Sequence, residues 1–169
     1  MRKRLKVACG DCSLQRLCLP VGLDESEFIK LEKVIARGKP LARGKHIYFP
    51  GDPFTSLYAV RSGTVKTYSV ASDGTEYVTG FYLPGEIIGL DALCTGVHPC
   101  GAKTLETSSL CELPYDHLED LAERVPNIAK QLLRIMSQEL HSDEKLLMMV
   151  GSQPAKSRLI ALFLSLSTR

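Results

Sequence analysis

The chain has 169 residues, 44% of them hydrophobic and 24% charged, and its net charge is +2. That length suits one domain with an appended element, and so small a charge does not imply nucleic-acid binding across the whole surface. No apolar run reaches the roughly 18 residues of a membrane span, and the basic N-terminus lacks the apolar stretch of a signal peptide. We therefore expect a cytoplasmic protein that crosses no membrane, in which clustered cysteines stay reduced and favour metal over disulfide.

Three cysteines near the N-terminus, Cys9, Cys12 and Cys18, have the spacing C-x2-C-x5-C. The segment around them carries few apolar side chains, so it offers little core in which thiols could be buried. Thiolates bind soft metals such as iron and zinc, and three of them are one ligand short of a closed site. The spacing alone leaves a zinc ion and an iron–sulfur cluster equally open, with the fourth ligand supplied from elsewhere in the chain.

Residues 23–36 predict a helix. Asp24 suits the N-cap position, and Glu27, three residues later, completes a capping box. Apolar side chains then recur at helical spacing, at Phe28, Leu31, Val34 and Ile35. The sequence Arg-Gly-Lys-Pro at 37–40 is expected to end this helix.

Residues 41–113 read as short strands separated by turn signals. We expect strands at 46–49, 57–60, 65–70, 77–83 and 110–113. The sequence Ser72-Asp73-Gly74 is a strong signal for a hairpin turn. Regular short strands with Gly and Pro turns predict an antiparallel sandwich or barrel.

After Pro114 the chain predicts helices, at 116–124, at 127–151 and from 155 onward. The long helix carries a stripe with alternating spacings of four and three, which is typical of a coiled-coil seam. We call this stripe the seam, and its residues are Ala129, Leu133, Met136, Leu140, Asp143, Leu147 and Val150. A second apolar stripe, at Leu132, Ile135, Leu146 and Met149, would pack on the helix's own domain. Two faces indicate two partners, so we expect a parallel homodimer.

Asp143 is the one acid in the seam, and in a parallel dimer it would face its own copy. Two carboxylates about 4 Å apart repel by roughly 4 kcal/mol at an effective dielectric constant of 20, and burial adds a desolvation cost. An association held near balance in this way can be switched by a modest input. The alternative is that Asp143 lies just off the seam, in water.

Four stretches of this sequence, 9–20, 58–63, 79–81 and 105–114, together resemble the FNR branch of the CRP/FNR superfamily. Its members are bacterial regulators that sense oxygen through an oxygen-labile 4Fe–4S cluster. The resemblance implies that Cys111 is the fourth cluster ligand beside Cys9, Cys12 and Cys18. Cys94 and Cys100 match no ligand position in this family. Leu17, beside Cys18, either packs the loop or shields the cluster from oxygen.

The resemblance also implies an α+β fold, in which a cyclic-nucleotide-binding-type antiparallel β-roll (a double-stranded β-helix or jelly roll) precedes a long dimerisation helix. The expected parts are a cysteine loop at 1–20, a sensory β-roll with flanking helices at 21–126, the dimerisation helix at 127–151, and the start of a truncated DNA-binding domain at 152–169. Promoter DNA would bind only through the missing helix-turn-helix domain. The hairpin tip at 72–74, which reads first as a turn, corresponds to a region that touches RNA polymerase in the family.

Other functions find less support in the residues. Relatives that bind cyclic AMP follow Gly-Glu with an Arg-Ser pair that grips the phosphate, whereas here Gly85-Glu86 is followed by Val-His-Pro-Cys-Gly at 97–101. Because no arginine is available for a charge-assisted bond to phosphate, we expect no cyclic nucleotide, and His98 reads as a surface loop residue. We find no Ser/His/Asp set, phosphate-binding glycine loop or His-rich metal site, so we expect no enzyme.

We therefore predict the sensor and dimerisation portion of an oxygen-sensing 4Fe–4S transcriptional regulator. In this reading the cluster controls dimerisation, and hence promoter binding by the full-length protein at low oxygen. The alternatives are a zinc-stabilised dimerisation module without redox sensing, and a cyclic-nucleotide receptor domain.

Overall fold

The computed structural model describes Cys12, Leu14 and residues 18–167. The chain divides into two compact units, Met1–Ala129 and Lys130–Arg169. Within the described residues, none of the helices combines the length and the apolar character that a membrane crossing requires.

Helix α1 (Glu25–Val34) begins as the sequence predicts, with the complete capping box. The Glu27 N–H donates to Asp24 Oδ1 at 2.9 Å, and the Asp24 N–H donates to Glu27 Oε2 at 3.0 Å. The predicted end of the helix is wrong. Ile35 is already extended, and the next two residues form strand β1 (Ala36–Arg37), because their backbone pairs with strand β8 (Ser109–Pro114).

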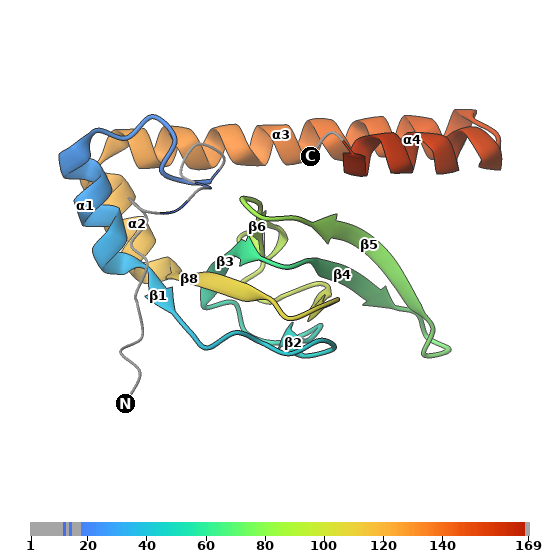
Figure 1. The fold of residues 1–169 in the computed structure, drawn as a ribbon, viewed down its shortest axis with the longest axis horizontal. Coiled ribbons are helices and arrows are strands. Elements are labelled where there is room, and N and C mark those ends of the chain that lie inside the picture. Colours follow the sequence, from blue (N-terminus) through green and yellow to red (C-terminus); the bar gives the residue numbers. More distant parts are fainter. Residues whose placement is uncertain (1–11, 13, 15–17, 168–169) are drawn as a thin grey trace. The chain divides into compact units, whose positions relative to one another are not determined.

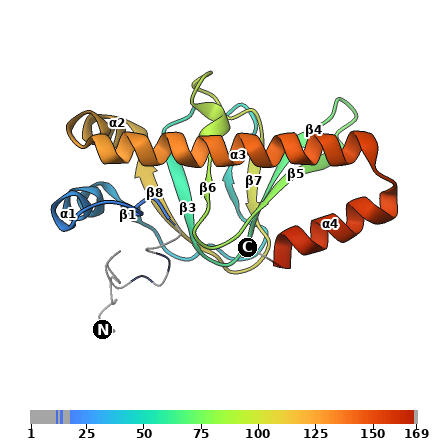
Figure 2. The same cartoon turned by 90° about the horizontal axis from the view of Figure 1, so that it is seen from above.

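The described part of the first unit contains two four-stranded antiparallel sheets, which confirms the predicted fold class (Figures 1 and 2). One sheet has the order β1-β8-β3-β6, with β3 at Ser56–Ser62 and β6 at Ile87–Ile88. The other has the order β2-β7-β4-β5, with bounds His46–Tyr48, Gly101–Thr104, Val65–Val70 and Glu76–Tyr82. Strands β1, β6 and β7 were not among the predicted ones. They are two to four residues long and have too few side chains to show a period of two.

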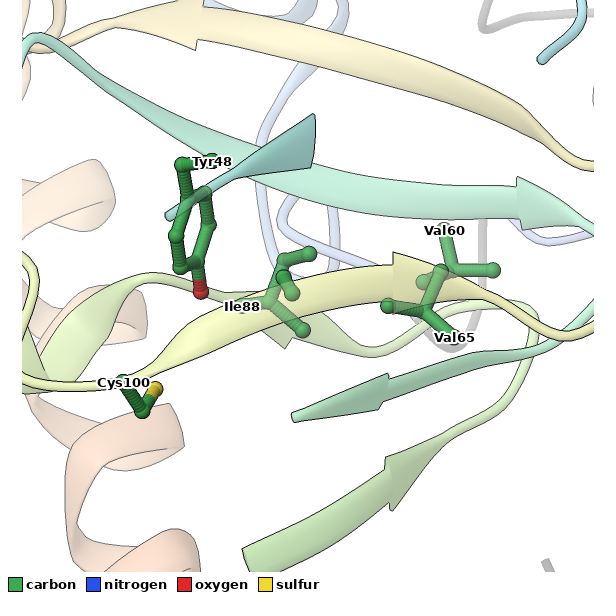
Figure 3. Close-up of a cluster of buried hydrophobic side chains, with 6 residues drawn as sticks. Tyr48, Val60, Val65, Ile88 and Cys100 are labelled. Atoms are coloured by element: carbon green, nitrogen blue, oxygen red, sulfur yellow. The ribbon is translucent and has the colours of Figure 1, made fainter. Parts of the chain in front are cut away.

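A cluster of buried side chains from both sheets forms the core of the first unit. Figure 3 shows Val60 and Val65 at one end of this cluster, and Tyr48 and Cys100 at the other. Ile88 and Ala102 complete it. Side chains from both sheets therefore meet in the space between them.

The predicted hairpin turn at 72–74 is confirmed. Strands β4 and β5 pair up to Val70 and Glu76, and the Ala71 N–H donates to the Thr75 carbonyl at 3.0 Å. Asp73 Oδ1 accepts from the Thr75 N–H at 2.9 Å, and Gly74 supplies the positive φ of +85° that the turn requires.

His98 corrects the sequence reading, which placed it on the surface. It is only 3% exposed, and its ring stacks on Tyr48 with 3.6 Å between centroids and meets the edge of Phe54. Its backbone is fixed as well, since its N–H donates to the Asp52 carbonyl and its own carbonyl accepts from the Gly51 N–H. Aromatic packing from segments distant in sequence thus outweighs the polarity of the imidazole.

Three further helices follow the sheets: α2 (Tyr115–Arg124), α3 (Pro126–Ser152) and α4 (Ala155–Ser167). Helices α1 and α2 contact each other in the first unit (Figure 1). The second unit contains α3 from Lys130 onward and α4, joined by a tight connection in which the Gln153 N–H donates to the Met149 carbonyl.

Gly63, in the turn between β3 and β4, offers a test of this fold. Its φ is +82°, and a Cβ there would lie 2.8 Å from both the Ser108 Cα and the Thr107 carbonyl oxygen. Gly74 has a similar φ, but an added Cβ would meet nothing within 4 Å. Gly74→Ala is expected to lower the free energy of unfolding by about 1 kcal/mol, the cost of the left-handed backbone. Gly63→Ala is expected to cost about 2 kcal/mol more, because backbone must also move.

Urea unfolding followed by circular dichroism measures both values. Equal losses for the two variants would contradict the close approach of the Gly63 turn to the backbone at 107–108.

Candidate functional site

Cys111 lies in strand β8, with a neighbouring strand on each side. Its Cα pairs with that of Ala59 in β3 and with that of Arg37 in β1. Because side chains alternate along a strand, Cys111 and Leu113 share one face of the sheet. The pairing on both edges fixes the register, so the thiol has a defined position on that face.

The described residues of the N-terminal segment lie over this face of the sheet, and together they line a partly open hollow. Its walls are mostly apolar. The lining residues are Cys12, Leu14, Cys18, Leu19, Pro20, Ile35, Ala59, Val60, Arg61, Cys111 and Leu113. We call it the cysteine pocket, since three of the four predicted ligand cysteines line it. The fourth, Cys9, and the proposed shielding residue Leu17 lie outside the described residues.

The three described thiols are of the chemical type that holds iron–sulfur clusters. They do not converge as the ligands of a single ion do, because the described residues contain no group of three Cys, His, Asp or Glu side chains placed to hold a metal ion. A zinc ion with Zn–S bonds of about 2.3 Å would draw its sulfur ligands to about 3.8 Å from one another. The hollow is lined by thiols from two separate parts of the chain, the N-terminal segment and strand β8.

Two arginines act on the Cys111 thiol. Burial raises its pKa, while the positive charges of Arg37 and Arg61 oppose that rise, and Arg37 also hydrogen-bonds the sulfur. Arg37 in addition contacts Glu32 Oε1 at 3.4 Å. The sequence reading missed both arginines as site residues. Arg37 lies beside the thiol because β1 pairs with β8. Strand β1 has only two residues, which is too short for a strand pattern to be recognised in the sequence.

The segment that carries Cys18 is held by turns and by one buried side chain. The Cys18 N–H donates to the Leu14 carbonyl at 3.0 Å, and the Cys18 carbonyl accepts from the Val21 N–H at 3.2 Å. Leu19 is 1% exposed and anchors the segment by its apolar side chain. Residues 18–22 of this segment form turns and a bend.

The other two cysteines do not line the cysteine pocket. Cys100 belongs to the core cluster, where its thiol lies 3.0 Å from Asp91 Oδ2, and its burial raises its pKa to about 12. Cys94 is exposed, with its sulfur 4.0 Å from the Asp91 carbonyl. A buried thiol that stays protonated is chemically inert.

Gly85 and Glu86 correspond to the Gly-Glu pair of the nucleotide-binding relatives. Here the Glu86 side chain stabilises a local turn. Its Oε2 accepts from the Leu83 N–H at 2.8 Å. The segment from His98 to Cys100 packs into the core. The described geometry therefore uses these residues for packing and backbone support.

The seam of helix α3 is exposed in the single chain. Leu133, Leu140 and Leu147 are 66%, 62% and 73% exposed. Asp143 is exposed as well. By contrast, Ile128, at the start of the same helix, is fully buried. Apolar side chains of this size gain about 1.5–3 kcal/mol each on burial, so the exposed row is a candidate contact surface.

Comparison with known proteins supports the resemblance seen in the sequence. A family model described as the cyclic nucleotide-binding domain matches residues 39–125. The chain is 42% identical over 163 residues to the fumarate nitrate reduction regulatory protein of Klebsiella oxytoca, which covers 96% of this chain and 65% of that relative. It is 40% identical over 161 residues to the transcriptional activator protein anr of Pseudomonas aeruginosa, covering 95% of this chain and 66% of that relative.

Among solved structures, the catabolite activator protein of Thermus thermophilus matches with a TM-score of 0.67 and 27% identity, over 79% of this chain and 62% of that one. The chain thus spans about 65% of the length of the curated relatives it matches. These relatives are regulators of transcription and not enzymes. Family model, sequence relatives and fold agree, and the chain belongs to the cyclic nucleotide-binding domain family and, within it, to the CRP/FNR superfamily of transcription regulators.

Proposed function

We propose that this chain is the oxygen-sensing and dimerisation portion of a transcription regulator that holds a 4Fe–4S cluster. The observation that carries the proposal is the cysteine pocket, in which thiols from the N-terminal segment and from strand β8 line one apolar hollow. Relatives of about 41% identity are named as fumarate and nitrate reduction regulators. The protein would work in the cytoplasm, where thiols stay reduced.

Cys9, Cys12, Cys18 and Cys111 would hold the cluster, and Leu17 would limit the access of oxygen to it. When bound, the cluster supplies iron–sulfur chemistry that oxygen disrupts. The protein's own part is to fix one thiol on the sheet through the strand register and to bring the others on a segment with few anchors. When the thiols of both parts share one group, the segment is held against the sheet.

Dimerisation through the seam would connect this site to DNA binding. In a parallel pair the exposed row from Ala129 to Val150 would be buried, and the two Asp143 carboxylates would be brought together. The free energy gained by burying apolar side chains and the charge repulsion oppose each other. The order of the segment that carries Cys12 and Cys18 would then decide whether the pair forms. The full-length protein would bind promoter DNA through its C-terminal part, and the exposed hairpin tip at 72–74 would be available to RNA polymerase.

Neither alternative function is favoured by a specific observation. A zinc module would use the same thiols, and the relatives named as fumarate and nitrate reduction regulators favour the cluster over it. A cyclic-nucleotide receptor would need a charged partner for the phosphate, and the segment at 97–101 has no arginine and places His98 and Cys100 in the core.

Replacement of Cys111 tests the ligand set. After anaerobic reconstitution, Cys111→Ser is expected to lose most of the bound iron and sulfide and the brown absorption. Cys100→Ser and Cys94→Ser should keep wild-type contents, since their thiols lie outside the pocket. Iron and sulfide assays with an absorption spectrum measure this. Zinc without sulfide in the wild-type protein would refute the cluster, and full contents in Cys111→Ser would refute the fourth ligand.

Arg61 tests the electrostatics of the pocket in the cluster-free protein. The pKa of Cys111 already lies above its usual value of 9.0 because burial outweighs the arginines. Arg61→Ala removes one of the opposing charges, so this pKa rises further and the thiolate fraction at about pH 8 falls. Alkylation of Cys111 by iodoacetamide, followed by peptide mass spectrometry, should become slower. Arg43→Ala, on an exposed loop, is the matched control, and equal rates for both variants would contradict the role of Arg61.

Asp143 tests the balance of the seam. In air, Asp143→Ala is expected to dimerise more tightly than the wild type, by up to about a thousandfold, because roughly 4 kcal/mol of repulsion is removed. Sedimentation equilibrium of the cluster-free protein gives the dissociation constants. Glu144→Ala removes the adjacent exposed acid, one position off the seam, and should leave association unchanged. No difference between Asp143→Ala and the wild type would place Asp143 outside the interface.

A further inference from the structure

The carboxylate of Glu27 joins two parts of the first unit that are a hundred residues apart. Asn127 Nδ2, in the first turn of α3, donates to Glu27 Oε1 at 3.0 Å and to Oε2 at 3.1 Å. The same Oε2 accepts from the Asp24 N–H at 3.0 Å. Both side chains are half-buried, so water competes less for these bonds than it would at an exposed position.

The surroundings of the pair are tightly packed. Leu31 of α1, Leu118 of α2, and Val125 and Ile128 at the junction of α2 with α3 are all at most 2% exposed. The junction itself is fixed by backbone bonds, in which the Val125 N–H donates to the Leu121 carbonyl and the Ile128 N–H to the Val125 carbonyl. Helices α1, α2 and α3 thus each bury an apolar side chain here, and Glu27 and Asn127 supply a directional contact between α1 and the start of α3.

The other side of Glu27 leads to the cysteine pocket. Asp24 is six residues after Cys18, and the chain between them makes consecutive turns, with the Val21 N–H on the Cys18 carbonyl and the Leu23 N–H on the Pro20 carbonyl. The Asp24 N–H at the end of these turns then reaches Glu27. A change in the conformation of the segment around Cys18 would therefore affect the Glu27 carboxylate, which Asn127 contacts.

We propose that Glu27 and Asn127 are positioning residues that couple the cysteine segment to the first turn of α3. The inference rests on the proposed function, because it names the contact through which the order of the cysteine segment would reach the seam. The seam begins at Ala129, two residues after Asn127. The Asp24 N–H and the Asn127 amide both donate to the Glu27 carboxylate, and these bonds orient the first turn of α3 relative to α1. When the turns at 18–24 relax, Glu27 loses one of its two partners and that orientation weakens.

The decisive variants exchange donor and acceptor. Asn127→Asp places a second carboxylate against Glu27, and repulsion replaces the bond. An acid in the first turn of a helix is favourable for the helix itself, so α3 should still form. Glu27→Gln combined with Asn127→Asp restores the link with its direction reversed, since the amide introduced at position 27 can donate to the new carboxylate. Asp24→Ala is the matched control, because it removes the side-chain half of the capping box and leaves the Glu27–Asn127 bonds in place.

The measurement is the ratio of the dimer dissociation constants of cluster-free and anaerobically reconstituted protein, from sedimentation equilibrium. Iron and sulfide contents are checked on each sample. Asn127→Asp is expected to lower this ratio about tenfold with unchanged cluster content, the double variant to restore it, and Asp24→Ala to leave it within about threefold of wild type. Amide exchange at 128–133 in the cluster-free protein gives a second readout, and should be faster in Asn127→Asp and slow again in the double variant.

The outcomes separate the two proposals. A wild-type ratio near one would overturn the proposed function and this inference with it. A large wild-type ratio that Asn127→Asp leaves unchanged would overturn the coupling role of Glu27 and Asn127 alone. Failure of the double variant to restore the Asn127→Asp loss would also overturn it, because the effect would then come from the substitution at 127 and not from the link.

Discussion

The constraint on which the rest of this structure depends is the register of strand β8. A slip of one residue would turn Cys111 to the other face of the sheet and bring its neighbour to the cysteine pocket. Pairing with β1 on one side and β3 on the other prevents that slip. The sheet thus supplies a thiol in a fixed position, facing the segment that carries Cys12 and Cys18. A ligand set divided between a rigid and a weakly held part links the order of the weak part to the group they share.

The interior between the two sheets holds the core cluster and not the cysteines that line the pocket. In the described residues, side chains of both sheets meet between them, and His98 stacks on Tyr48 at the centre of this packing. The cysteine pocket lies instead on the other face of the β1-β8-β3-β6 sheet, under the N-terminal segment. The position of the cysteine pocket on this outer face has a physical consequence. A group held there would contact the segment at 18–20 and Ile35, the residue that follows α1.

Much of the fold could be read from the sequence because its signals are local. The capping box at Asp24 and Glu27, the hairpin turn before Gly74 and the seam spacing in α3 each involve residues a few positions apart. Cys12, Cys18 and Cys111 line one pocket, whereas spacing alone left the fourth ligand open. Their role as ligands remains a prediction.

What the sequence could not predict depends on contacts distant along the chain. Strand β1 exists because Ala36 and Arg37 pair with β8, and this pairing ends α1 earlier than its own periodicity would. His98 is buried against the rings of Tyr48 and Phe54, more than forty residues away in the sequence, so its polar character led to the wrong prediction of a surface position. The link between Glu27 and Asn127 spans a hundred residues, and neither residue type is unusual where it stands.

The opposing terms at the seam explain why so small a link could matter to the proposed switch. In each chain three exposed leucines gain about 1.5–3 kcal/mol apiece when buried. Against this stand roughly 4 kcal/mol between the Asp143 carboxylates and the loss of free translation and rotation, about 4–15 kcal/mol. Terms of similar size and opposite sign leave a balance that one or two hydrogen bonds, each worth about 1 kcal/mol, can tip. A tighter seam would stay paired whatever the state of the cysteine segment, and a weaker one would never pair.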